Sequence, residues 1–145
     1  MPVGQRIGNA VIRAILATPG LATLAGKRLV TLYVVGISSG KRYSIPVAYL
    51  PDGDALLIGT PFKWGRNLRT GHSVDLRLKG RLRTADVQVF SREADVVRHL
   101  DAICRANAMY AKSNGIRRGS DGTPDPGDLR DSWARGTRVF RLSPR

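Results

Sequence analysis

The chain has 145 residues, a length at which one domain can bury a core without disulfides or metals. Its 42% hydrophobic and 24% charged residues are close to the globular average, which excludes a mostly disordered or fibrous chain. No apolar run approaches the roughly 18 residues of a membrane-spanning helix, and Asn9 and Arg13 interrupt the N-terminal stretch, which is no signal peptide. We therefore expect a single cytoplasmic domain over residues 1–145.

Charge is the unusual feature of the composition. The 24 Lys and Arg residues outnumber 11 Asp and Glu and give a net charge of +13. Residues 1–51 contain six basic side chains and no acidic one, and arginine, which grips phosphate and carboxylate in a bidentate way, supplies most of the cations. We expect an anionic partner, although charge alone does not distinguish nucleic acid, a membrane surface and a polyanionic cofactor.

The pattern of β-branched residues, alternation and turns predicts a mainly β (α+β) fold. Strands are expected over residues 29–37, 43–50, 55–60, 74–78, 82–90 and 137–142. Turns at 38–41, 51–54 and 79–81 join neighbouring strands as hairpins, which indicates an antiparallel sheet. Six strands in so short a chain favour a split β-barrel that hides its edges.

Two helices accompany the predicted sheet. Apolar residues recur at helical spacing over 7–18, and a second helix is expected from an N-cap at Ser91 to about Tyr110, before the last strand. Residues 113–136, with five glycines and two prolines, are expected to form a loop or mobile lid without a helix of their own. Trp133 would then be the apolar side chain that the closed lid buries over a substrate.

Conventional catalytic residues are sparse. His99 and Cys104 lie on the second helix among apolar neighbours and are expected to pack, while His72 has no carboxylate pair or cysteine close by in the sequence. No metal site is expected. An enzyme with this sequence would therefore take its reactive atom from a bound organic cofactor.

Two segments could hold such a cofactor. The turn Ser38, Ser39, Gly40, Lys41 and Arg42 combines hydroxyls, backbone N–H groups and cations that can bind a phosphate. The loop containing Thr60, Lys63, Trp64, Arg66 and Asn67 could stack an aromatic ring and hydrogen-bond its edge. Both segments have a plainer interpretation, an ordinary basic turn in one case and a tryptophan anchored in the core in the other.

Several short motifs resemble the deazaflavin (F420)-dependent nitroreductase family of the flavin-binding split-barrel superfamily. They are Gly36 with Ser39-Gly40-Lys41, Pro46, Gly53-Asp54, Trp64 with Asn67-Leu68, and Gly80-Arg81. Each is weak alone, but together they follow the family order over residues 29–90.

The resemblance implies a split barrel that binds coenzyme F420, an anionic deazaflavin, and transfers a hydride to a quinone, nitroaromatic or unsaturated substrate. It places Ser39, Gly40 and Lys41 at the cofactor phosphate and Thr60, Lys63, Trp64 and Asn67 at the deazaflavin. Tyr110 resembles the position from which family members project tyrosines over the substrate, and it would donate a hydrogen bond or proton.

Four possibilities stay open at this stage. The cofactor could be FMN, or the chain could be a basic nucleic-acid-binding module, although its 6% aromatic content argues against a base-stacking surface. A homodimer and a weak association with membrane surfaces through residues 5–18 are also open, because split barrels often pair and this segment is basic.

Overall fold

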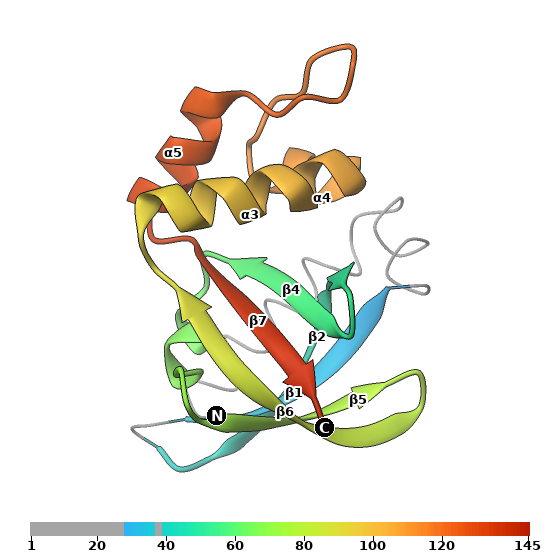
Figure 1. Ribbon diagram of the computed structural model, residues 1–145. Helices are drawn as coiled ribbons and strands as arrows, with labels where there is room; N and C mark the ends of the chain where they lie inside the picture. Colours follow the sequence, from blue (N-terminus) through green and yellow to red (C-terminus); the bar gives the residue numbers. More distant parts are fainter. Residues whose placement is uncertain (1–27, 37–38) are drawn as a thin grey trace.

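A computed structural model describes residues 28–36 and 39–145. In this part of the chain an antiparallel sheet curls into a half-barrel, and helices cover one end of it (Figure 1). The elements are β1 Leu29–Val35, β2 Arg42–Ala48, β3 Leu50–Asp52, β4 Ala55–Thr60, the 3-10 helix η1 Lys63–Asn67, β5 Ser73–Leu78, β6 Arg81–Phe90, α3 Glu93–Ala106, α4 Ala108–Ser113, α5 Pro126–Ala134 and β7 Arg138–Pro144. The helix predicted over residues 7–18 lies outside the described residues.

Alternating side chains explain how the strands enclose a core. In β1, Val30, Leu32 and Val34 are buried, while the residues between them are less buried. β5 repeats the pattern with Val74 and Leu76. One face of the curled sheet is therefore apolar, as the period of two in the sequence predicts.

The sheet order is β2-β1-β5-β6-β7-β4-β3, so β2 and β3 are its two edges. These edge strands are consecutive in the chain and are separated only by Tyr49, whose N–H donates to the carbonyl of Arg28 at 3.0 Å. The half-barrel is thus closed by the chain itself. The split-barrel prediction is confirmed, but the strand count is wrong, because the predicted strand 43–50 breaks at Tyr49 and Leu50–Asp52 pairs with β4.

The second predicted helix is two helices. α3 ends at Ala106, and Asn107, with φ −140° and ψ 96°, interrupts the helical backbone before α4. The Asn107 side chain accepts a hydrogen bond from the N–H of Tyr110 at 3.0 Å, which caps α4. The predicted N-cap at Ser91 is also wrong, since Arg92 holds that position without a side-chain bond. No helix in the described ranges is long and apolar enough to cross a bilayer.

Part of the segment 113–136, expected to lack a helix, forms α5. Asp125 accepts from the N–H of Asp128 at 2.9 Å and caps the helix, and Pro126 begins it. Leu129 of α5 and Ile116 are buried in the apolar cluster that also contains α3 residues. The composition suggested a loop because few apolar residues are present, but these two are enough to attach α5 to α3.

An ion pair joins the two ends of this segment. The Arg117 guanidinium donates to both carboxylate oxygens of Asp128, at 2.8 and 3.1 Å, and the Arg117 backbone N–H donates to the same side chain at 3.0 Å. These hydrogen bonds lower the pKa of Asp128 from its ordinary value of 3.8 to about 2. The pair therefore stabilises the attachment of α5 while Asp128 is ionised.

We expect Asp128→Asn to lower the melting temperature at pH 7. A depressed folded-state pKa contributes stability above the unfolded value near 3.8, and the contribution disappears as the pH falls through about 2. The difference between parent and variant should therefore shrink between about pH 4 and pH 2, as followed by circular dichroism. Asp131→Asn, an exposed change in α5, is the control, and a gap that stays constant with pH would contradict this assignment.

The turn between β5 and β6 has an unfavourable backbone residue. Lys79 has φ +50° and is the one non-glycine residue with positive φ in the described ranges; Gly80 follows at φ +79°. Two consecutive positive φ values in a two-residue hairpin favour Asn-Gly over Lys-Gly.

Lys79→Asn should accordingly raise the free energy of unfolding by about 1 kcal/mol, measured by urea denaturation. Lys79→Ala separates backbone from charge, because it removes the cation and keeps the strained conformation. An equal gain in both variants would mean that charge relief, rather than backbone strain, determines the effect.

Candidate functional site

A pocket of about 540 Å³ opens where β1 ends and β5 begins. We call it the barrel-end pocket; its wall consists of the end of β1, the turn after it, the residues after η1 and the start of β5. Its lining residues are Tyr33, Val34, Val35, Gly36, Gly40, Asn67, Leu68, Arg69, His72, Ser73, Val74, Asp75 and Val87. The volume lies within the range of small-molecule and cofactor sites.

The pocket brings together the two segments that the sequence singled out. Gly40 belongs to the predicted phosphate-binding turn, and Asn67 to the predicted ring-binding loop. They are 27 residues apart in the sequence (67 − 40) and reach one pocket because β1 leads into the turn and contacts η1. This convergence is the main structural reason to regard the pocket as a functional site.

The turn is held by its own hydrogen bonds. The N–H of Gly40 donates to the carbonyl of Gly36 at 2.8 Å, and the N–H of Lys41 donates to the Ser39 hydroxyl at 3.3 Å. That hydroxyl also bonds the Tyr43 hydroxyl at 3.0 Å. The expectation that these backbone N–H groups are exposed for a phosphate is wrong for Gly40 and Lys41. Ser38 lies outside the described residues.

Close packing explains the glycine that begins this turn. A Cβ on Gly36 would lie 2.7 Å from the Ser39 hydroxyl oxygen and 3.2 Å from the Tyr43 ring. A larger residue would push the turn away from β2. Gly36 thus keeps the turn against the strand and at the rim of the pocket.

Side-chain cations remain available to an anion beside the turn. Lys41 is exposed, and the Arg42 guanidinium lies 4.5 Å from the centre of the Tyr33 ring. The Tyr33 hydroxyl accepts a hydrogen bond from Arg77 at 3.2 Å. Tyr33, which sequence analysis did not single out, therefore gives the pocket an aromatic wall held between two arginines.

The loop after β4 is mostly structural. Thr60 is buried and its hydroxyl accepts from the N–H of Phe62 at 3.1 Å. Trp64 is only 5% exposed and packs in the barrel core, where its indole N–H has no hydrogen-bond partner. The Asn67 amide donates to the Trp64 carbonyl at 3.0 Å. The core interpretation of Trp64 thus agrees with the structure, and neither Trp64 nor Thr60 lines the barrel-end pocket.

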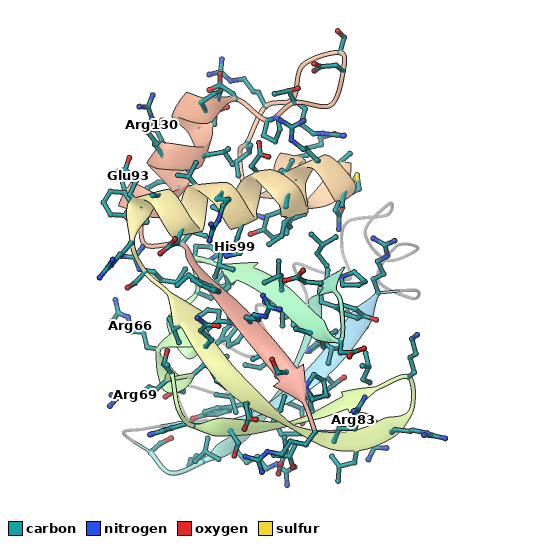
Figure 2. The ribbon with its side chains drawn as sticks, in the orientation of Figure 1. Arg66, Arg69, Arg83, Glu93, His99 and Arg130 are labelled. Carbon is teal, nitrogen blue, oxygen red and sulfur yellow. The ribbon has the colours of Figure 1, made fainter. Side chains whose placement is uncertain are left out.

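The residues after η1 add charge that the sequence alone did not assign to the site. Arg69 and His72 line the pocket, and the exposed Arg66 of η1 lies on the same side of the molecule as Arg69 (Figure 2). Asp75 is the acidic residue of the pocket wall and accepts from Thr84 at 3.0 Å. Lys63 is the first residue of η1. Arg69 and Asp75 thus balance each other within the lining, and the additional positive charge comes from Lys41, Arg42 and Arg66, which are close to lining residues in the sequence.

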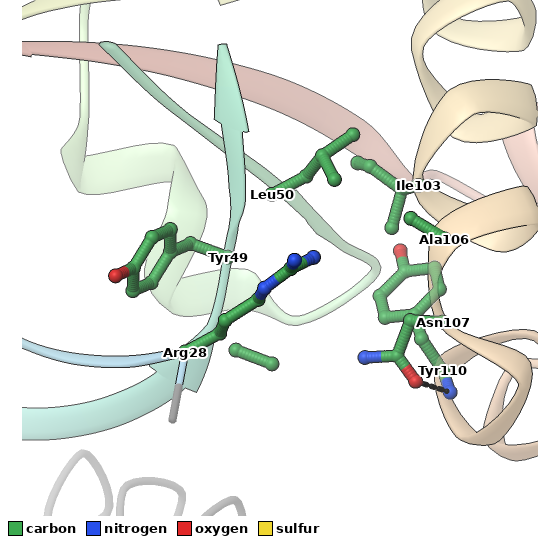
Figure 3. A pocket seen from close by; sticks show the side chains of 8 residues that line it. Arg28, Tyr49, Leu50, Ile103, Ala106, Asn107 and Tyr110 are labelled. Carbon is green, nitrogen blue, oxygen red and sulfur yellow. Dashed lines mark hydrogen bonds between the residues drawn. The ribbon is translucent and has the colours of Figure 1, made fainter. Parts of the chain in front are cut away.

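Tyr110 lies at a second pocket, of about 220 Å³, between the barrel and the helices (Figure 3). Arg28, Leu50, Ile103 and Asn107 also line it, so it is at the opposite end of β1 from the barrel-end pocket. Tyr110 does not line the barrel-end pocket, although its hydroxyl contacts Gly59, next to the predicted cofactor residue Thr60, and its catalytic role stays a prediction.

The Tyr110 hydroxyl is hydrogen-bonded to the barrel. It donates to the carbonyl of Gly59 in β4 at 2.9 Å, and burial strongly raises the pKa of the phenol. A Cβ on Gly59 would lie 2.5 Å from that hydroxyl, so the glycine makes room for the contact. Tyr110 thus pins the start of α4 to β4 as a neutral hydrogen-bond donor.

Trp133 also has a structural contact. Its indole N–H donates to the carbonyl of Ser91 at 2.9 Å, and Arg138 lies 5.8 Å from the ring centre. The bond ties α5 to the connection between β6 and α3. Trp133 lines neither pocket, and its contact with substrate stays a prediction.

Of the other reactive side chains, Cys104 is buried and His99 is half-buried, and both are in packing positions. Burial raises the pKa of the Cys104 thiol to about 12, so it remains protonated at neutral pH. The His99 ring lies 4.4 Å from the Phe90 ring, and burial followed by Arg98 lowers its pKa. The described residues contain no group of three potential metal ligands.

The sequence matches no protein-family model and no curated protein. The fold, however, is similar to three solved structures. A pyridoxamine 5′-phosphate oxidase-like protein from Listeria innocua aligns over 90% of this chain and 94% of its own, with 15% identity and a TM-score of 0.52. An F420-H2-dependent reductase aligns over 80% and 94%, with 14% identity and a TM-score of 0.53.

The third structure is an FAD-binding protein from Mesorhizobium loti, which aligns over 88% of this chain and 89% of its own, with 13% identity and a TM-score of 0.50. At such identities the likeness shows the fold alone. The chain therefore has a split-barrel fold shared by flavin- and deazaflavin-binding proteins, and membership of the deazaflavin-dependent nitroreductase family stays a prediction.

Tyr110→Phe tests whether Tyr110 is a structural donor. Loss of the bond leaves the Gly59 carbonyl without this donor, and we expect a loss of about 1–2 kcal/mol in the free energy of unfolding. Cofactor binding should not change, because Tyr110 lies away from the barrel-end pocket. Unchanged stability with impaired cofactor binding or turnover would instead support its predicted catalytic role.

Proposed function

We propose that the protein is an oxidoreductase that binds coenzyme F420 at the barrel-end pocket and reduces a small organic substrate. The observation that supports this function best is the convergence of the Gly40 turn and Asn67 on one pocket. The fold, which an F420-H2-dependent reductase shares, agrees with this function.

The residues of the pocket fit the chemistry of the cofactor. F420 has a phosphate and a polyglutamyl tail, and the pocket offers Lys41, Arg42 and Arg69 at its rim. Its heteroaromatic ring needs an apolar or aromatic surface with polar groups at the edge. Tyr33 and Asn67 provide such groups on the same wall.

When bound, the reduced deazaflavin would supply a hydride. The chain's own residues would bind and orient: the cations of the rim would hold the anionic tail, and the Tyr33 side chain would contact the ring. Arg77 and Arg42 keep Tyr33 in place through a hydrogen bond of 3.2 Å and a stacked guanidinium at 4.5 Å. None of these residues is required to transfer a proton, so a substrate could take its proton from water.

FMN is the alternative cofactor. It shares the phosphate and the planar ring system, and flavin-binding proteins have the same fold. It lacks the polyglutamyl tail, so it makes less use of the wide basic rim. F420 binding should therefore depend on several cations, whereas FMN binding should depend mainly on the residue that holds its phosphate.

The test is calorimetric titration of the purified protein with F420 and with FMN. Lys41→Glu and Arg69→Glu should each weaken F420 binding by about 1–3 kcal/mol, roughly fivefold to 150-fold, because each places like charge against the anion. Lys112→Glu, an equal charge change on α4 and away from the pocket, should have little effect.

The titration can contradict each part of the proposal. Unchanged affinity in folded Lys41→Glu and Arg69→Glu variants would show that the cofactor does not bind at the barrel-end pocket. Absence of binding to both cofactors would contradict the proposed function itself. Tight FMN binding without F420 binding would select the alternative.

A further inference from the structure

The hairpin between β5 and β6 has a basic end that lies outside the lining of the barrel-end pocket; of its cations, only Arg77 also contacts Tyr33 of that site. We call residues 77–83 the hairpin tip. It contains Arg77, Lys79, Arg81 and Arg83, all exposed, and no acidic residue. Figure 1 shows the hairpin extending from the barrel on the side away from α3 and α5, and Figure 2 shows Arg83 there.

An apolar side chain stands among these cations. Leu82 is 59% exposed, and it lies between Arg81 and Arg83 in the strand and opposite Arg77 on β5. Of the nearby acids, Asp86 pairs with Arg145 at 2.7 Å, and Asp75 accepts a hydrogen bond from Thr84 at 3.0 Å. Because side chains alternate along a strand, Leu82 projects from the same face of the hairpin as Arg77, and Arg81 and Arg83 project from the other face. The end of the hairpin therefore presents both an apolar side chain and cations.

The tip is also rigid. Arg77 donates to the Gly80 carbonyl at 3.2 Å and to the Tyr33 hydroxyl at 3.2 Å, so it braces the turn against β1. Lys79 occupies a positive-φ position where asparagine or glycine would be less strained. A lysine at such a position adds charge at the outermost point of the hairpin in spite of the backbone strain.

We propose that the hairpin tip binds the surface of an anionic phospholipid bilayer. The four cations would lie at the headgroup phosphates, where each basic residue adds attraction, and Leu82 would enter the boundary of the acyl chains. Nucleic acid is the less suitable anion, because residues 77–83 contain no aromatic side chain on which a base could stack. The proposal does not depend on the identity of the cofactor.

Vesicle co-sedimentation tests the proposal with the full chain. The protein should sediment with vesicles of phosphatidylcholine and phosphatidylglycerol, and far less with phosphatidylcholine alone. Binding should weaken as salt rises above about 0.1 M. The double variant Arg81→Gln, Arg83→Gln should bind about thirtyfold more weakly, near fivefold for each charge removed.

A matched control removes the same charge elsewhere. Lys112→Gln, Arg130→Gln changes two exposed cations on α4 and α5, and its binding should stay within about twofold of the parent. An equal loss in the two double variants would mean that net charge alone attracts the protein, which overturns the assignment to the hairpin tip. If the parent protein does not bind anionic vesicles, the proposal is wrong.

Two further measurements test the leucine and the rival partner. In the Leu82→Trp variant, anionic vesicles should shift the tryptophan emission to the blue, and brominated lipids should quench it. Unchanged emission would contradict insertion. A single-stranded oligonucleotide that binds more tightly than the vesicles, with the same dependence on Arg81 and Arg83, would assign the surface to nucleic acid instead. Circular dichroism confirms that each variant is folded.

Discussion

The closure of a single antiparallel sheet is the constraint on which the rest of the molecule depends. β2 and β3 are the two edges of the sheet, and the chain joins them through Tyr49, whose N–H bonds the Arg28 carbonyl at 3.0 Å. Closure surrounds an apolar core of β1, β2, β4, β5, β6 and β7 side chains.

The barrel-end pocket is a consequence of this closure. β1 and β5 are antiparallel neighbours, so the turn after one and the approach to the other meet at the same end of the barrel. In the turn the N–H groups of Gly36, Gly40 and Lys41 have hydrogen-bond partners, and η1 is fixed by the buried Trp64. What projects from this rigid frame is a set of cations and an aromatic ring, a combination suited to a planar anionic ligand.

Surplus charge is the second property of the whole chain. Six aspartates of the described part form ion pairs with arginines, and the pair between Arg117 and Asp128 joins α5 to the preceding loop. Among the remaining cations, one set lies at or beside the barrel-end pocket and another at the hairpin tip, and others are spread over α4, α5 and their connections. The first two sets are at separate places on the molecule, so the two proposed sites can be tested independently.

The sequence by itself determined the strands, the antiparallel arrangement and the turn and loop that meet at the pocket, because apolar alternation and glycine-containing turns act locally. The sequence did not decide whether Trp64 packs in the core or contacts a ligand. Only the tertiary structure decided that Trp64 is buried, that Tyr110 bonds Gly59 across 51 residues, and that Tyr33 and Arg69 face the site. The break at Asn107 and the helix α5 were missed because a few long-range contacts outweigh weak local propensity. Contacts between distant residues depend on how the sheet closes, which no local pattern encodes.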